Sequence, residues 1–258
     1  ILYEGTWKND VNEGYGKYFD RKGNIIYMGD VIENKVCGEG ATYEDNKIIY
    51  KGSYVKGYRE GFGISYIDGK KEYEGSWGRG LRNGKGKKYS SNGSLIYDGS
   101  YKDNEKSGYG TDYKHDIEGD MYIYEGNWNN NEKNGEGVLF NRVRLVTGSY
   151  LLYKKGKNIY EGIWKDDHEE GYGVLCFDNG DKYEGEFVKG KMQGQGIYYF
   201  DNKQRYDGEW YQGKREGTGI LYSDTDTIIK QGCWKDNEYQ DYGEDELCII
   251  CYANKRCM

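Results

Sequence analysis

The chain has 258 residues, a length that ordinarily forms one or two compact domains. Its mean hydropathy of −1.03 and its 36% hydrophobic residues are low for a compact core of that size. The net charge of −7 argues against general nucleic-acid binding, which needs a clustered basic surface, and no stretch approaches the ~18 apolar residues of a membrane-spanning helix.

Tyrosine and glycine dominate the composition, with 30 and 41 residues, and proline is absent. Tyrosine carries a large apolar ring whose hydroxyl needs only one partner, so it can take the place of aliphatic core residues. This composition predicts an elongated β array in which each repeat packs only on its neighbours.

A motif of the form Tyr-acidic-Gly-x-Trp recurs along the chain, mostly at steps of 23 or 24 residues. It begins at Tyr3, Tyr27, Tyr50, Tyr73, Tyr97, Tyr124, Tyr160, Tyr183, Tyr206 and, in degraded form, Lys230. All six tryptophans stand at its fifth position: Trp7, Trp77, Trp128, Trp164, Trp210 and Trp234. A fixed period of this length is typical of repeat proteins.

Each repeat is predicted to be a β-hairpin. The Tyr, Gly and Trp of the motif stand at i, i+2 and i+4, so in a strand they project from one face, while the charged residues between them project from the other. The polar segment after the motif, such as residues 8–13, has turn chemistry. We expect the second strand to open at a Gly-x-Gly, whose first glycine follows the motif glycine by nine residues in nine repeats.

Two features of the second strand vary little. An aromatic residue stands three positions beyond the second glycine in every complete repeat except one, where Cys176 replaces it. Glycine inside a strand implies either a ring lying over bare backbone or a bend that curves the sheet, and we favour the ring. We therefore expect substitution of Gly84 or Gly171 to cost more stability than substitution of a turn glycine.

The connection between repeats is longest after Gly137, where residues 138–159 contain VTGSYLLY. We expect an irregular long hairpin or a vestigial repeat there. An isolated hairpin is marginally stable, so the hairpins must pair edge to edge, and the sheet then has two open ends. Since unpaired edge strands seek partners, we expect a homodimer.

The segments YEGTWKNDVNEGYG, YEGSWGRGLRNGKG, YEGIWKDDHEEGYG and YDGEWYQGKREGTG resemble MORN repeats. The resemblance covers about residues 1–243 and departs from the pattern at Val31, Lys230 and Asp241. It implies an all-β fold, an elongated and twisted single-layer antiparallel sheet of about ten tandem hairpins. It also implies a non-catalytic scaffold or recognition module for protein partners or, as the alternative, a membrane-tethering module for anionic phospholipids.

The aromatic face is the first candidate binding surface. Tyrosine and tryptophan are favoured at interfaces, so five tryptophans are candidate partner-binding residues. They are Trp7, Trp77, Trp128, Trp164 and Trp210. The alternative, which we favour for each single ring, is that these side chains form the core of a sheet that has nothing else to bury them against.

Two basic stretches are candidate lipid-binding sites, since lysine and arginine clusters attract anionic membranes. The first comprises Lys70, Lys71, Arg79, Arg82, Lys85, Lys87 and Lys88. The second, residues 142–157, has five basic residues and no acidic one. The alternative is a solvated face of alternating charge, which the acidic balance of the chain favours.

Residues 244–258 are predicted to be an acidic linker and the beginning of a RING-type zinc finger. Cys248 and Cys251 have the C-x2-C spacing that places two thiolates on one zinc ion, and the segment resembles the opening of a RING finger. A complete finger needs a Cys-x-His and further cysteine pairs. The chain is therefore expected to be the substrate-facing fragment of a RING-type ubiquitin ligase, the alternative being a coincidental cysteine pair.

Enzyme chemistry is not expected from this fragment, which has no predicted catalytic residue and needs no cofactor for its repeats. Its two histidines, His115 and His168, stand in polar connecting segments, and Gly-x-Gly elements that open strands cannot cradle a nucleotide phosphate. The scattered cysteines suit a reducing compartment, so we expect a cytoplasmic protein, with cytoskeletal or membrane association as further alternatives.

Overall fold

A computed structural model describes residues 2–115, 121–147 and 150–241. These residues form twenty antiparallel strands and no helix, and consecutive strands pair as tandem hairpins. The predicted all-β class and the antiparallel sheet of tandem hairpins are therefore confirmed. Within the described ranges, no helix is long and apolar enough to cross a membrane.

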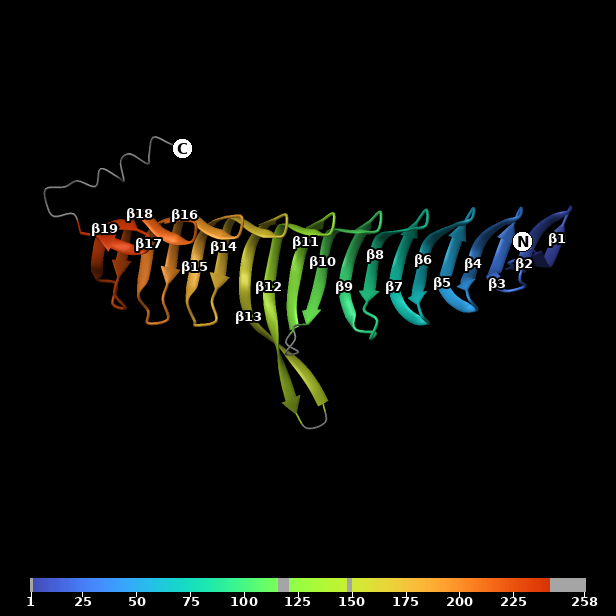
Figure 1. Cartoon of the computed structure of the whole chain (residues 1–258), viewed down its shortest axis with the longest axis horizontal. Coiled ribbons are helices and arrows are strands. Elements are labelled where there is room, and N and C mark those ends of the chain that lie inside the picture. Colours follow the sequence, from blue (N-terminus) through green and yellow to red (C-terminus); the bar gives the residue numbers. More distant parts are fainter. Residues whose placement is uncertain (1, 116–120, 148–149, 242–258) are drawn as a thin grey trace, which may run out of the picture. The chain divides into compact units, whose positions relative to one another are not determined.

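The chain divides into two units. The N-terminal unit comprises residues 1–114 and 128–131. Its strands lie side by side in chain order (Figure 1). They are β1 (Leu2–Lys8), β2 (Val11–Phe19), β3 (Ile25–Ile32), β4 (Lys35–Glu44), β5 (Lys47–Val55), β6 (Tyr58–Ile67), β7 (Lys70–Gly78), β8 (Leu81–Tyr89), β9 (Leu95–Lys102) and most of β10 (Glu105–His115).

The C-terminal unit comprises residues 115–127 and 132–258. It contains most of β11 (Met121–Asn129), then β12 (Glu132–Thr147), β13 (Tyr150–Lys165), β14 (His168–Cys176), β15 (Lys182–Val188), β16 (Lys191–Tyr199), β17 (Arg205–Tyr211), β18 (Lys214–Tyr222), β19 (Ile228–Lys235) and β20 (Glu238–Gln240). Each of these strands from β12 onward pairs with the next.

The turn inside each repeat is shorter than the polar segment in the sequence suggests. Two residues with positive φ, such as Asn9 (50°) and Asp10 (63°), connect the two strands, as in a type I′ turn. The strands therefore extend into the polar segment, and β2 begins at Val11, three residues before Gly14. The expectation that the second strand opens at Gly-x-Gly was wrong, because a type I′ turn needs only two residues.

The first glycine of Gly-x-Gly lies in a β-bulge. In the first repeat, Gly5 pairs with Gly16 but Trp7 pairs with Asn12, so β2 carries extra residues opposite β1. Gly14 has φ of 88°, and Gly84 in the fourth repeat has φ of 98°, a conformation that glycine adopts without penalty. Our preference for a ring over backbone was therefore wrong at the first glycine, where a bend requires the residue.

The ring does lie over the second glycine. A Cβ added to Gly86 would stand 2.2 to 2.4 Å from ring and hydroxyl atoms of Tyr73, the tyrosine of the same repeat. Gly86 pairs across the strands with the motif glycine Gly75, whose added Cβ would stand 2.4 Å from the Gly86 Cα. The two glycines thus form a bare strip of backbone beneath the tyrosine ring.

Each motif tyrosine also secures the bulge through its hydroxyl. Tyr73 donates a hydrogen bond to the carbonyl oxygen of Ser76, three residues on, at 2.9 Å. The equivalent bond recurs from Tyr3, Tyr27, Tyr50, Tyr97, Tyr124, Tyr160, Tyr183 and Tyr206. The acceptor lies between the motif glycine and the bulge, so the bond satisfies a carbonyl beside the irregular part of the ladder.

The fifth position of the motif links one repeat to the preceding one. The Trp77 indole Nε1 donates to the carbonyl oxygen of Gly63, the second glycine of the preceding repeat, at 3.1 Å. The same bond recurs from Trp128, Trp164, Trp210 and Trp234. The ring also packs edge to face between Tyr50 and Tyr73, with 5.2 Å between centroids in both pairs. We call the side of the sheet that carries these rings the core face, and the opposite side the outer face.

Residues 138–159 lie in a long hairpin rather than in a repeat of regular length. β12 and β13 have 16 residues each, and their pairing continues from Gly137 and Gly162 to Thr147 and Tyr150. The hairpin extends past the edge at which the loops between β14 and β15 and between β16 and β17 lie (Figure 1).

Replacing a glycine beneath a ring should destabilise the chain more than replacing a turn glycine. In Gly196→Ala, the new methyl group would stand 2.3 to 2.5 Å from Tyr183 atoms, and we expect a loss of about 3 kcal/mol. Gly213→Ala is the matched control, since its Cβ meets nothing within 4 Å and only its φ of 83° is strained, at about 1 kcal/mol. Urea unfolding measures both, and equal shifts would contradict the ring-over-glycine packing.

Candidate interaction surfaces

The motif tryptophans are core residues, apart from the first. Trp77, Trp128, Trp164 and Trp210 are 2 to 7% exposed, whereas Trp7, on the first strand, is 60% exposed. The indole nitrogens of the four buried tryptophans are engaged by backbone carbonyls. Of the five candidate partner-binding tryptophans, only Trp7 therefore presents its ring to solvent.

A row of cations covers the aromatic core, which the sequence analysis missed. Arg59 lies over Tyr50 and Trp77, with its Cζ 4.6 and 5.3 Å from the two ring centroids. The equivalent residues that cover rings are Arg82, Lys106, Lys133 and Arg215. The available signal was an arginine or lysine two positions before the first glycine of Gly-x-Gly in five repeats. Each cation is attracted to the face of the ring beneath it, so cation–π interactions add to the apolar packing of the core.

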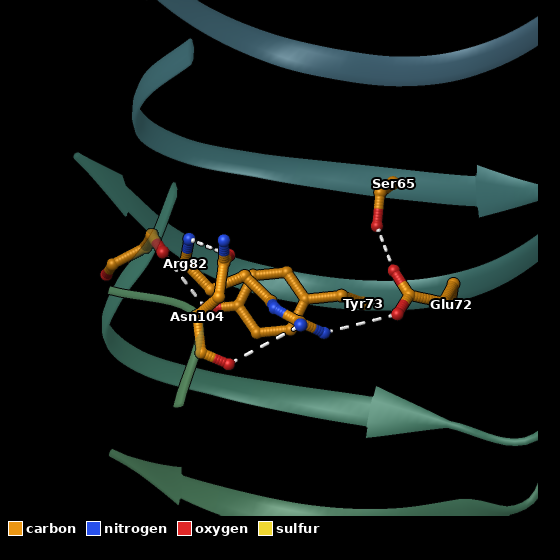
Figure 2. Close-up of polar contacts among 6 residues, drawn as sticks. Ser65, Glu72, Tyr73, Arg82 and Asn104 are labelled. Atoms are coloured by element: carbon orange, nitrogen blue, oxygen red, sulfur yellow. Dashed lines mark hydrogen bonds and ion pairs between the residues drawn. The ribbon is translucent and has the colours of Figure 1, made fainter. Parts of the chain in front are cut away.

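Arg82 shows how such a cation is held (Figure 2). Its Nη1 lies 3.2 Å from Oε1 of Glu72, whose other oxygen accepts a hydrogen bond of 2.7 Å from Ser65 Oγ. Its backbone amide donates to Oδ1 of Asn104, and its Nη2 donates to the Asn104 carbonyl, at 2.8 and 3.4 Å. The guanidinium also lies 5.7 Å from the Tyr73 centroid. Arg82 is therefore committed to contacts within the fold.

Burial on the core face changes acid–base behaviour. It raises the pKa of Tyr73 to about 12, with the Arg82 cation opposing the shift. Because the unfolded value is about 10, this tyrosine stabilises the fold below pH 10, and its contribution is lost as the pH rises towards 12. Burial also lowers the pKa of Lys106, although its bond to Asp112 opposes the change.

Three further residues of the first basic stretch have internal partners. Lys71 forms an ion pair with Glu74, which lowers the pKa of that carboxyl. Lys87 lies 3.4 Å from Asp98 on the neighbouring strand. Lys70 donates a hydrogen bond to the carbonyl oxygen of Ser91 at 2.8 Å. The ion pairs of Lys71 and Lys87 reduce the positive charge that the stretch can offer to a ligand.

The remaining basic residues of that stretch do not form one patch. Lys85 is exposed on the outer face, in register with Ser100, while Lys88 is half-buried and in register with Tyr73 and Tyr97 on the core face. Arg79 occupies a turn. No ion pair of these three occurs among the described residues. Of the second stretch, the structure describes the basic side chains of Arg142 and Lys157 only.

The outer face carries exposed rings that the sequence analysis did not single out. They stand between the two glycines of Gly-x-Gly in alternate repeats: Tyr15, Phe62, Tyr109 and Tyr172. In the N-terminal unit, Tyr15, Phe62 and Tyr109 are 57, 60 and 52% exposed. The repeats between them have Glu39 and Lys85 at this position. The signal in the sequence is this alternation, visible only once the position is known to face outward.

The described residues hold no group of three or more His, Cys, Asp or Glu able to bind a metal ion. Cys248 and Cys251, like the rest of residues 244–258, lie outside the described residues. Cys37 and Cys176 are free thiols. His168 is exposed at the start of β14.

Comparison with protein-family models gives a match over more than half of the chain. The model for the MORN repeat matches residues 3–25, 50–71, 73–95, 97–111, 124–140, 160–182, 183–205 and 206–227. These segments begin at eight of the ten motif starts and leave out the repeat that contains Val31 and the degraded repeat at Lys230. A comparison with curated proteins gave no match.

Proposed function

This chain belongs to the MORN-repeat family, and from that premise we propose that it is a non-catalytic scaffold or recognition module that binds protein partners through its outer face. The observation that carries the proposal is the row of exposed rings at Tyr15, Phe62 and Tyr109. On the core face, the buried tryptophans and the cations make contacts within the fold. The hairpin does not require an aromatic residue at the position of the outer rings, because Glu39 and Lys85 occupy it in neighbouring repeats.

The spacing of these rings suits a partner that extends across several strands. Successive rings are two repeats apart, which is four strands and thus about 19 Å at ~4.8 Å per strand. Aromatic residues are enriched at protein interfaces, since a rigid ring contributes a large contact area at a low entropic cost. A single exposed ring needs no explanation, whereas a row at one repeat position indicates a surface for binding.

Removing the row should abolish partner capture without unfolding the chain. We expect a Tyr15→Ser, Phe62→Ser, Tyr109→Ser triple variant to lose the proteins that the immobilised wild-type chain captures from cell extract, as identified by mass spectrometry. Glu39→Ser with Lys85→Ser is the matched control, which changes the same repeat position without removing a ring. Capture of the same proteins by the triple variant, at an unchanged urea midpoint, would contradict the proposal.

We further propose that the chain forms a homodimer through β1. Among the described strands, β1 pairs only with β2, and its residues Leu2 and Trp7 are 67 and 60% exposed. An open edge with exposed apolar side chains is a template for pairing with another strand. Light scattering across a concentration series should show a mass rising to twice that of the monomer, and a Leu2→Ser, Trp7→Ser variant should remain monomeric. A constant monomer mass for the wild-type chain would end this proposal.

Tethering to anionic phospholipid is the alternative function. It is favoured by Lys85, which is exposed on the outer face and forms no ion pair among the described residues. If the first basic stretch binds membranes, phosphoinositide vesicles should sediment the chain at low salt, and Lys85→Glu should reduce the sedimented fraction. Arg82→Lys is the control, because Arg82 contacts Glu72 and Asn104. Failure of the wild-type chain to sediment would remove the lipid-binding alternative.

A role as the substrate-facing part of a RING-type ubiquitin ligase is an extension of the proposal. It is supported by the spacing of Cys248 and Cys251, which suits two ligands of one zinc ion. The decisive observation is the sequence of the full-length protein, which must contain a Cys-x-His and further cysteine pairs after Cys251. Their absence would rule out a RING finger.

A further inference from the structure

A shallow, largely open depression of about 520 Å³, called the cavity below, lies in the C-terminal unit at the base of the long hairpin. Its lining includes Lys157, Cys176, Phe177, Asp181, Lys182 and Tyr199. Its lining combines apolar surface with a few polar groups, which can accept part of a single side chain of a partner.

The cavity exists where one repeat lacks a ring. Cys176 stands three residues beyond the second glycine, where the other complete repeats have phenylalanine or tyrosine. Lys182 lies in register with Cys176 on one side and with Tyr199 on the other. On the Tyr199 side its ammonium covers the ring, 4.3 Å from the centroid. On the Cys176 side the smaller thiol leaves the equivalent space unfilled.

The walls suit an aromatic guest. Tyr199 supplies ring surface, and Lys182 supplies a cation that already stacks on that ring. The same arrangement recurs in the next repeat, where Arg205 lies 4.0 Å from the Tyr222 centroid. A ring entering beside Cys176 would thus take up a position that the fold fills with its own side chain in the neighbouring repeats.

The described charges at the entrance balance, and Lys157 is the cation there that an acidic guest could meet. Asp181, the acidic residue of the lining, already accepts hydrogen bonds from the Tyr198 hydroxyl and the Asn179 amide, at 2.6 and 2.8 Å. Lys182 is paired with Glu184, but Lys157 is exposed and forms no ion pair among the described residues. Lys157 also ends a stretch, residues 142–157, that has five basic residues and no acidic one.

We propose that this cavity receives a tyrosine or phenylalanine side chain carried by an acidic peptide segment of a partner protein. The ring fills the space left by Cys176, and carboxylates that flank it meet Lys157. This inference deepens the proposed function by naming the chemistry of a partner, and its site is separate from the row of Tyr15, Phe62 and Tyr109.

A labelled random copolymer of glutamate and tyrosine is a direct probe, and polyglutamate of the same length is its control for charge alone. Fluorescence polarisation should show that the chain binds the copolymer at least tenfold more tightly than polyglutamate, on the order of 1.4 kcal/mol. Equal affinity for the two polymers, or no binding of the copolymer, would overturn the inference.

Two variants test the position of the guest. Cys176→Tyr fills the cavity with the residue of the neighbouring repeats and should weaken copolymer binding by about tenfold, whereas the size-matched Cys176→Ser should leave it unchanged. Lys157→Glu, an exposed change that cannot disturb the core, should weaken binding roughly threefold or more at low salt. Unaltered binding by both Cys176→Tyr and Lys157→Glu would refute the site. If the Tyr15→Ser, Phe62→Ser, Tyr109→Ser variant still binds the copolymer, the cavity binds it independently of the outer row, and the two proposals can fail separately.

Discussion

The packing of one tyrosine ring over two facing glycines is the interaction on which the whole structure depends. In the fourth repeat, Tyr73 covers Gly75 and Gly86 and donates its hydroxyl hydrogen bond to Ser76 beside the bulge. The tyrosine side chain thus provides a hydrogen bond to a carbonyl oxygen beside the bulge. It also covers the glycine backbone against water and packs edge to face with neighbouring rings. The nine motif tyrosines make the same hydroxyl bond, so within each unit a chain with few aliphatic residues builds its core from tyrosine.

Because of this core, the two faces of the sheet tolerate amino-acid substitution to different degrees. On the core face, the tryptophan indoles bond to glycine carbonyls of the preceding repeat and cations such as Arg59 cover the rings, so a change at one position disturbs two repeats. On the outer face, the residue between the glycines varies from Tyr15 to Glu39 and Lys85 without altering the hairpin. A repeat protein built this way can change its binding properties on one face while the other keeps the fold.

Departures from the repeat pattern have structural consequences of different kinds. Val31 replaces a tryptophan and is completely buried, so the core closes around a smaller side chain. Cys176 replaces an outer-face ring, and there a cavity remains. The two sites differ in position: Val31 lies on a central strand in register with Gly14 and Val36, whereas Cys176 ends its strand beside a loop and the base of the long hairpin. The unfilled space is therefore found near the irregular part of the chain.

The sequence by itself determined the strands, the hairpins and the aromatic face, because the period of two residues within the motif and its spacing of 23 or 24 residues leave few other arrangements. It did not distinguish the roles of the two glycines in Gly-x-Gly, since a positive φ and a steric demand both select glycine. Nor did it show that Arg82 belongs to the core, because its partners Glu72 and Asn104 come from the preceding strand and the following turn. Only the tertiary structure decided these points, because each depends on side chains of neighbouring strands and repeats. The exposure of Tyr15 and the cavity at Cys176 were decided in the same way.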